Sequence, residues 1–131
     1  MQKSSTVAII NQDNKVLILL RGKTAPWMPG RYCLPGGKVE ENESLTHAAV
    51  RELLEETNIS CHVNDLWPNT IQYKNGRSKI VFSVKINQPT VQLNWEHDDY
   101  VWVDSSSVLE YDLVPGLRTT IYAILGKYVS N

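Results

Sequence analysis

Short apolar runs separated by turn-forming residues occur along most of this chain, and they predict β-strands. Two runs rich in β-branched residues flank Asn11-Gln12-Asp13-Asn14 and predict a hairpin. The pair Asn75-Gly76 predicts a second hairpin, because this dipeptide favours a tight type I′ turn. The strands predicted in this way cover residues 6–10, 15–21, 31–34, 59–66, 70–73, 79–87 and 100–103.

Helical spacing of apolar residues predicts three further elements, over about residues 44–57, 105–111 and 117–128. Asn42 or Ser44 is a suitable cap for the first helix, and Asn58 suits the left-handed position that ends one. A serine or Asp104 is expected to cap the second, and Pro35-Gly36-Gly37 to end the third strand. This mixed order predicts an α/β (α+β) fold, in which helices cover both faces of a mixed β-sheet.

The first predicted helix carries a cluster of carboxylates. Glu52, Glu55 and Glu56 share one face, because residues three and four apart lie together on a helix. They border an apolar stripe that consists of Leu45, Ala49, Val50, Leu53 and Leu54. Taken alone, such a run fits a solvated, Glu-rich helix end. However, three like charges repel one another and oppose the helix dipole, so a divalent cation with hard oxygen ligands is their natural partner.

Composition and charge narrow the class of protein. The 131 residues are expected to form one domain, spanning residues 1–131. The net charge of −1 argues against a nucleic-acid partner, and the longest apolar run, residues 16–20, is too short to cross a membrane. Because the first residues contain no apolar leader, Cys33 and Cys61 are expected to be free thiols in a cytoplasmic protein.

The spacing of charged residues and glycines around the helix forms a longer motif. Gly37 is followed after five residues by Glu43, and after seven more by Arg51-Glu52-Leu53-Leu54-Glu55-Glu56-Thr57-Asn58-Ile59. This segment resembles the Nudix box, G-x5-E-x7-R-E-U-x-E-E-x-G-U, in which U is a bulky aliphatic residue. Eight of the nine defined positions match, and the departure is Asn58 in place of glycine. Since asparagine tolerates the left-handed conformation, the departure implies a small stability cost and no loss of chemistry.

The resemblance extends beyond the box. Arg21, the loop Trp27-Met28-Pro29-Gly30 and the turn Leu34-Pro35-Gly36-Gly37 are similar to those of MutT-type small Nudix enzymes. The C-terminal half resembles the family more loosely, through Glu96-His97 and Val101-Trp102-Val103. The resemblance implies the Nudix-type α/β/α sandwich, in agreement with the fold expected from the pattern alone.

The resemblance also implies an activity, the hydrolysis of a phosphoanhydride bond in a nucleoside diphosphate-linked substrate. A nucleoside triphosphate split to the monophosphate and pyrophosphate is the first expectation. The resemblance also implies Mg²⁺ or Mn²⁺ as cofactor. A divalent cation suits this reaction, because phosphoryl transfer depends mainly on positioning and charge neutralisation. The implied metal ligands are Glu52, Glu55, Glu56 and the backbone carbonyl of Gly36.

The resemblance assigns roles to further residues. Arg51 belongs to the catalytic set because it orients the glutamates, and it pairs with Glu43, which is structural. Gly37 is structural and also borders the substrate. Arg21 and Trp27 are expected to contact substrate, although a strand-end arginine and a loop tryptophan are often simply solvated.

The general base is open between a box glutamate and a later acidic residue. Glu52 is the first candidate, because a carboxylate near metal-bound water suits this task. Glu96, Asp98 and Asp99 are the later candidates, on a stretch that also fits a solvated acidic loop. His97 shows no ligand-type spacing and is expected to be an ordinary residue.

The substrate is open as well. Preference for oxidised guanine depends, in MutT-like enzymes, on an asparagine before the last helix, and residues 114–118 contain none. A dinucleoside polyphosphate, ADP-ribose, a nucleotide sugar or the 5′ end of RNA are alternatives, and so is a Nudix-fold module that binds nucleotide without catalysis. The retained glutamates favour the enzyme. The expected partner is a small-molecule nucleotide, without a membrane, and the expected state is a monomer or homodimer.

Overall fold

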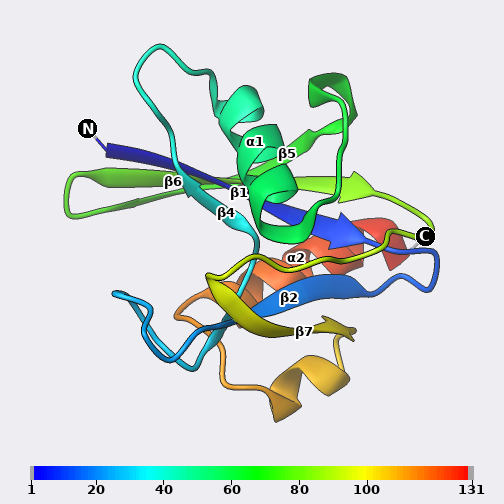
Figure 1. Cartoon of the computed structure of the whole chain (residues 1–131). Helices are drawn as coiled ribbons and strands as arrows, with labels where there is room; N and C mark the ends of the chain where they lie inside the picture. The colour runs from blue at the N-terminus through cyan, green and yellow to red at the C-terminus, as the bar shows by residue number, and fades with distance from the viewer. Residues whose placement is uncertain (1, 130–131) are drawn as a thin grey trace.

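The computed structural model describes residues 2–129, which form a seven-stranded mixed sheet and two α-helices (Figure 1). The strands are β1 (Gln2–Ile10), β2 (Val16–Arg21), β3 (Tyr32–Cys33), β4 (Gly36–Lys38), β5 (Trp67–Lys74), β6 (Arg77–Lys85) and β7 (His97–Val103). The helices are α1 (Leu45–Thr57) and α2 (Leu117–Val129), with the short 3₁₀ turns η1 (Val63–Asp65) and η2 (Ser107–Glu110).

Strand β1 lies at the centre of the sheet. The main strand order is β3-β2-β1-β6-β5, with β4 also paired to β1 and β7 also paired to β2. The β1–β6 pair is parallel, in register from Gln2 opposite Arg77 to Ile10 opposite Lys85, while the other strand pairs are antiparallel. At the outer edge, β5 has a register shift between Pro68 and Thr70.

Two hydrophobic cores lie on opposite faces of this sheet, one under each helix (Figure 1). Alternation along β1 places Val7 and Ile9 in the α1-side core and Ala8 and Ile10 in the α2-side core. A strand buried on both faces has no polar face, which explains the continuous apolar run in the sequence. The predicted α/β/α sandwich around a mixed sheet is therefore confirmed.

Both ends of α1 form as the sequence predicts. Ser44 is the N-cap, and its hydroxyl accepts a hydrogen bond from the backbone N–H of His47 at 3.1 Å. Asn58 adopts the left-handed conformation, with φ of 60°, and its backbone N–H donates to the Leu54 carbonyl at 2.9 Å. Both predicted hairpins are present as well, and the second turns at Asn75 and Gly76, both with positive φ.

Three predictions about local structure are wrong. Residues 59–66 do not form a strand: only η1 is regular there, and the chain instead buries Ile59 and Leu66 in the α1-side core. The third strand does end before Pro35, but Gly36 and Gly37, expected in the turn, belong to a new strand, β4. Leu54 is not part of the buried stripe, because it lies 47% exposed on the far side of α1.

The remaining differences concern boundaries. The polar residues 2–5 extend β1, because they pair with β6 on one side and β4 on the other. The short helix expected over 105–111 is the 3₁₀ turn η2, and the Asp104 carboxylate accepts hydrogen bonds from the backbone N–H groups of Ser106 and Ser107. Among residues 2–129, none of the helices has the length and apolar content needed to span a bilayer.

The left-handed Asn58 yields a stability prediction. Asn58→Gly should change the free energy of unfolding by less than about 1 kcal/mol, because glycine adopts this conformation freely and only the side-chain contact with Gln92 is lost. Asn58→Ala should destabilise by about 1 kcal/mol, because a Cβ disfavours positive φ. Urea unfolding of the three proteins checks both. An alanine variant as stable as the glycine variant would show that the helix end does not need this conformation.

Candidate active site

The site is built where β4 meets the first helix. Gly36 lies opposite Thr6 of β1, and a Cβ at Gly36 would lie 2.6 Å from the Cα of Thr6, so only glycine allows this pairing. A Cβ at Gly37 would in turn lie 2.6 Å from the carboxyl carbon of Glu52. The two glycines therefore let β4 lie flat against β1 on one side and against the glutamates of α1 on the other.

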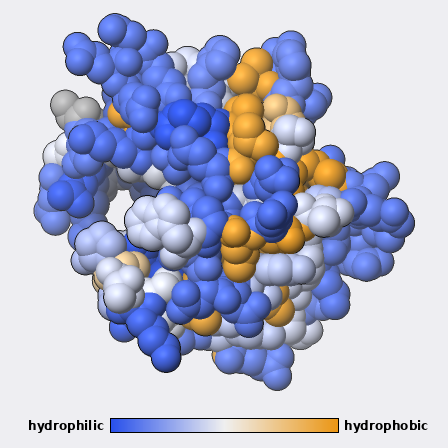
Figure 2. Space-filling model, in the orientation of Figure 1, coloured by the Kyte–Doolittle hydropathy of each residue, from blue (hydrophilic) through white to orange (hydrophobic). Residues whose placement is uncertain are grey.

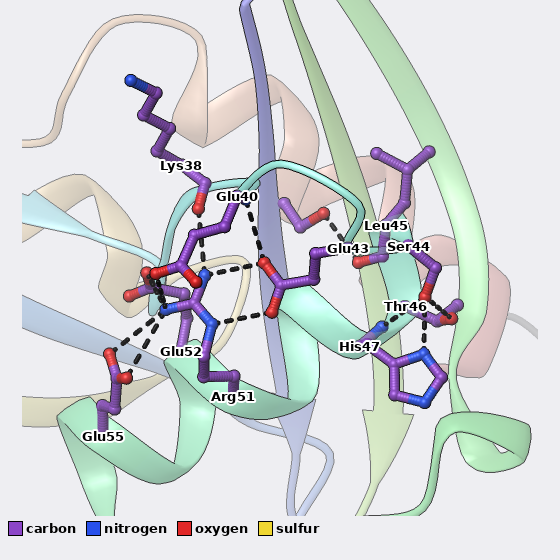
Figure 3. Close-up of polar contacts among 11 residues, drawn as sticks. Lys38, Glu40, Glu43, Ser44, Leu45, Thr46, His47, Arg51, Glu52 and Glu55 are labelled. Carbon is purple, nitrogen blue, oxygen red and sulfur yellow. Dashed lines mark hydrogen bonds and ion pairs between the residues drawn. The ribbon is translucent and has the colours of Figure 1, made fainter.

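Arg51 is the centre of a network of carboxylates (Figure 3). Its guanidinium group makes a two-point contact with Glu43, with Nε to Oε2 at 2.8 Å and Nη2 to Oε1 at 2.9 Å. Nη1 lies 2.9 Å from Glu52 Oε1 and 3.4 Å from Glu55 Oε2, and Nη2 also donates to the Lys38 carbonyl at 3.0 Å. The guanidinium group of Arg51 thus fixes both the loop after β4 and two of the three box glutamates.

The pKa values follow from this contact. Hydrogen bonds from Arg51 and from the backbone N–H of Glu40 lower the pKa of Glu43 to about 2. Glu43 is therefore charged throughout the physiological range. The pairing is consistent with a structural role for Glu43, which holds Arg51 in place.

Glu56 has a different environment. It is only 1% exposed, and one carboxylate oxygen accepts a hydrogen bond from the Gly36 N–H at 3.2 Å. Burial raises the pKa of Glu56 strongly, and the nearby carboxylates of Glu52 and Glu96 raise it further, against the opposing effect of the Gly36 N–H. A buried carboxyl beside other carboxylates is a costly arrangement, of the kind found where a protein binds a cation.

His97, which the sequence analysis treated as an ordinary residue, lies beside the buried carboxyl of Glu56. It is buried, and its Nε2 lies 3.5 Å from Glu56 Oε1 and 3.7 Å from the Cys33 sulfur. Burial, together with Arg21, lowers the pKa of His97 to about 4, so the contact with Glu56 joins a neutral imidazole and is not an ion pair at neutral pH. Its Nδ1 is buried without a hydrogen-bond partner in the described structure. The alternation of side chains along β7 places His97 on the inner face of the strand. This periodicity alone could not show which residues His97 contacts.

Arg21 and Trp27 lie together at the edge of this group. The Arg21 guanidinium lies over the Trp27 ring, 5.3 Å from its centroid, and Nε donates to the Trp27 carbonyl at 2.5 Å. Arg21 is directly opposite His97 in the β2–β7 ladder. The pair is therefore held beside the buried glutamate, with Trp27 48% exposed.

The later acidic residues separate in space. Glu96 is close enough to raise the pKa of Glu56, and its Oε1 accepts a hydrogen bond from the Asn94 side chain at 3.2 Å. Asp98 instead faces Gly22, and Asp99 accepts a hydrogen bond from the Tyr100 N–H at 2.8 Å. Of the three, Glu96 is the one whose charge acts on the box glutamates.

The donor chemistry of this junction fits a divalent cation. Glu52 and Glu56 supply hard carboxylate oxygens in a buried setting that disfavours negative charge, and a cation would offset both burial and repulsion. Within residues 2–129, no three His, Cys, Asp or Glu side chains are arranged as a metal-binding group, and Glu52 and Glu55 both contact Arg51. The face that carries α1 is mostly hydrophilic, as a charged substrate requires (Figure 2).

Comparison with known proteins gives one consistent result. The family model of the NUDIX domain matches residues 1–124. The nucleoside triphosphatase NudI of Escherichia coli is 26% identical over 133 residues, covering 92% of this chain and 94% of the relative. The MutT protein of Methanosarcina mazei Go1 is 26% identical with a TM-score of 0.77, covering 99% of this chain and 96% of that structure.

A further solved structure shares the fold at lower identity. The NUDIX domain of Shewanella oneidensis NrtR, in complex with ADP-ribose, has a TM-score of 0.81 at 19% identity, covering 97% of this chain and 88% of that structure. With a family model that spans almost the whole sequence, the chain belongs to the Nudix family and is a MutT-like hydrolase of nucleoside diphosphate-linked substrates.

Proposed function

We propose that the protein is a Mg²⁺- or Mn²⁺-dependent pyrophosphohydrolase that splits a nucleoside triphosphate into the monophosphate and pyrophosphate, with residues 1–131 as its single catalytic domain. The observation that carries the proposal is the buried Glu56 carboxyl, pressed against the other box glutamates and held by the Gly36 N–H. The name of its relative, nucleoside triphosphatase NudI, supports the choice of substrate class.

Glu52, Glu55, Glu56 and the Gly36 carbonyl are the residues that would hold the cation. When bound, the cation neutralises phosphate oxygens and acidifies water. Arg51 keeps Glu52 and Glu55 together through its ion pairs, at 2.9 and 3.4 Å. The position of Arg51 depends in turn on its ion pair with Glu43. The carboxylates of the box are therefore held in place before substrate binds.

In the reaction, the oxygen of a water molecule attacks a phosphorus of the anhydride linkage. The bond from that phosphorus to the bridging oxygen breaks, and the bridging oxygen leaves with the other product. A carboxylate accepts the proton of the attacking water, and Glu52 is our assignment for this base. Glu96 is the alternative, because it lies near enough to act on Glu56, whereas Asp99 is engaged with Tyr100.

Arg21 and Trp27 are proposed to contact the substrate. The guanidinium offers donors to phosphate oxygens, and the exposed part of Trp27 offers an aromatic edge. Their mutual stacking places both side chains on the same side of the site.

A panel of compounds tests the reaction with Mg²⁺ present. It holds nucleoside triphosphates, an oxidised purine triphosphate, a dinucleoside tetraphosphate, ADP-ribose and a nucleotide sugar, with monophosphate and pyrophosphate as readout. Cleavage of triphosphates to monophosphates supports the proposal. Selective cleavage of another compound would replace the substrate class, and nucleotide binding without turnover by folded protein would favour a binding module.

Glutamine substitutions test the box. Glu56→Gln and Glu55→Gln should lower kcat by at least about 100-fold, because the cation and the attacking water lose an anionic partner. The melting temperature should change little, because glutamine at position 56 replaces a carboxyl that already holds its proton, and Glu55 loses only an exposed ion pair with Arg51. Glu41→Gln, an exposed site on the loop after β4, is the control with the same change of charge. Retained activity with a large loss of stability would show that these glutamates serve only the fold.

The raised pKa of Glu56 predicts a pH dependence of stability without metal. At pH values between the unfolded-state and folded-state pKa of Glu56, the carboxyl is protonated in the folded protein and ionised in the unfolded chain. The stabilisation that this gives at low pH is therefore lost as the pH rises. In EDTA, the melting temperature should therefore fall from about pH 6 to about pH 9, and Glu56→Gln should make that fall smaller.

Added Mg²⁺ should raise the melting temperature more at the higher pH, because the ion replaces the proton. Thermal melts of both proteins across this range, with EDTA or Mg²⁺, make the measurement. Identical pH profiles for the wild type and Glu56→Gln would contradict the assignment of this proton to Glu56.

A further inference from the structure

Lys79 of β6 is a partly buried cation without a counter-charge. Within residues 2–129 no carboxylate lies at ion-pair distance from its ammonium group. Burial lowers the pKa of Lys79, opposed only by the Cys33 thiol. Since lysine is rarely buried without a partner, this arrangement needs an explanation.

Strand register places Lys79 in a row of polar side chains. Lys79 lies opposite Ser4 of β1 and Gln72 of β5, and Ser4 lies opposite Lys38 of β4. Residues in register share a face of the sheet, and Val81, two positions after Lys79, packs in the α2-side core. The row therefore faces α2.

The start of α2 closes one end of this row. The Gln72 side-chain amide lies 3.4 Å from the Thr120 hydroxyl, which itself donates to the Gly116 carbonyl at 3.1 Å. Two positions before Gln72 in β5, on the same face, the Thr70 hydroxyl is buried without a hydrogen-bond partner in the described structure. The row that contains Lys79 therefore includes a polar group with unused hydrogen-bonding capacity.

The same row borders the proposed reaction centre. The Cys33 thiol is influenced by three charged groups, Arg21, Glu56 and Lys79. Cys33 also lies against His97, which contacts Glu56. Strand register supports the same placement: Lys79 lies opposite Ser4, two residues before Thr6, and Thr6 lies opposite Gly36, whose N–H binds Glu56.

We propose that Lys79 recognises the nucleobase of the substrate, with Gln72 and Thr120 completing the contact. The lysine selects bases that carry a carbonyl oxygen at C4 of a pyrimidine or at C6 of a purine. The inference rests on the proposed nucleotide hydrolysis and names the substrate class of that site. An ammonium group has three donors and no acceptor, so it can pair with an exocyclic carbonyl oxygen but not with an exocyclic amino group. Uracil, thymine and hypoxanthine offer such an oxygen where cytosine and adenine carry an amino group.

The neighbours of Lys79 favour a base over a phosphate group. Phosphate oxygens have their own partners in Arg21 and a cation at the box glutamates. By contrast, Gln72 and Thr120 are neutral, and the row lies on the face of the sheet that carries the apolar α2-side core. A flat heteroaromatic ring with a few polar atoms fits an apolar surface that carries a small number of directed polar groups.

Two pairs of triphosphates test this, because each pair differs chiefly at one exocyclic position: dITP against dATP, and dUTP against dCTP. The wild type should favour the oxo member of each pair in kcat/KM by about 10- to 100-fold, the range for a hydrogen bond to a charged donor. Lys79→Met should reduce both ratios to near one, while the kcat for dATP stays within a few-fold of the wild-type value. Lys85→Met removes the same charge from the exposed end of β6 and should leave the ratios unchanged.

Binding separates this inference from the proposed reaction. Calorimetric titration of dITP and dATP into Glu55→Gln, with and without Lys79→Met, measures recognition in the absence of turnover. A preference for dITP that Lys79→Met abolishes supports the inference even if no triphosphate is hydrolysed by the wild type. Hydrolysis of triphosphates with equal kcat/KM for both members of each pair would overturn it and leave the proposed reaction standing. Unchanged ratios in folded Lys79→Met would overturn it as well.

Discussion

The pairing of β4 with β1 is the contact on which the site depends. It brings the Gly36 N–H to Glu56 and the backbone of Gly37 to the Glu52 carboxylate, and at Gly36 a Cβ would collide with the backbone of β1. The three residues of β4 thereby connect β1, the central strand, with the helix that carries the carboxylates. β1 is buried on both faces and is therefore a rigid support. The proposed reaction centre lies at the margin of this strand.

Charge is distributed unequally over the carboxylates of the box. Glu43 is paired with Arg51 and ionises easily, whereas Glu56 is buried among like charges and holds its proton. The same helix therefore carries one carboxylate that serves as an anchor and another whose ionisation is costly. That contrast arises from position alone, because the side chains are chemically identical, and it distinguishes an ion-paired carboxylate from a buried, protonated one within the same motif.

Most of the fold could be predicted from the sequence, because period, caps and turns act locally. Ser44, Asn58 and the Asn75-Gly76 turn show this most clearly. The errors lie where long-range contacts determine the local structure. β4 forms from glycines because they can pair closely with β1. Residues 59–66 form only the turn η1, because they do not pair with a strand of the described sheet. The spacing of the box predicted the glutamates, but His97 and Lys79 emerged only when strand register showed which residues they face.

The interruption of β5 between Pro68 and Thr70 has a consequence for behaviour at high concentration. An outer strand with free backbone groups and exposed side chains such as Ile71 and Tyr73 is a template for a neighbouring chain. A proline and a shift of register break the regular series of donors that such a neighbour would need. The irregularity thus acts as a guard against aggregation, at the edge of the sheet farthest from β3.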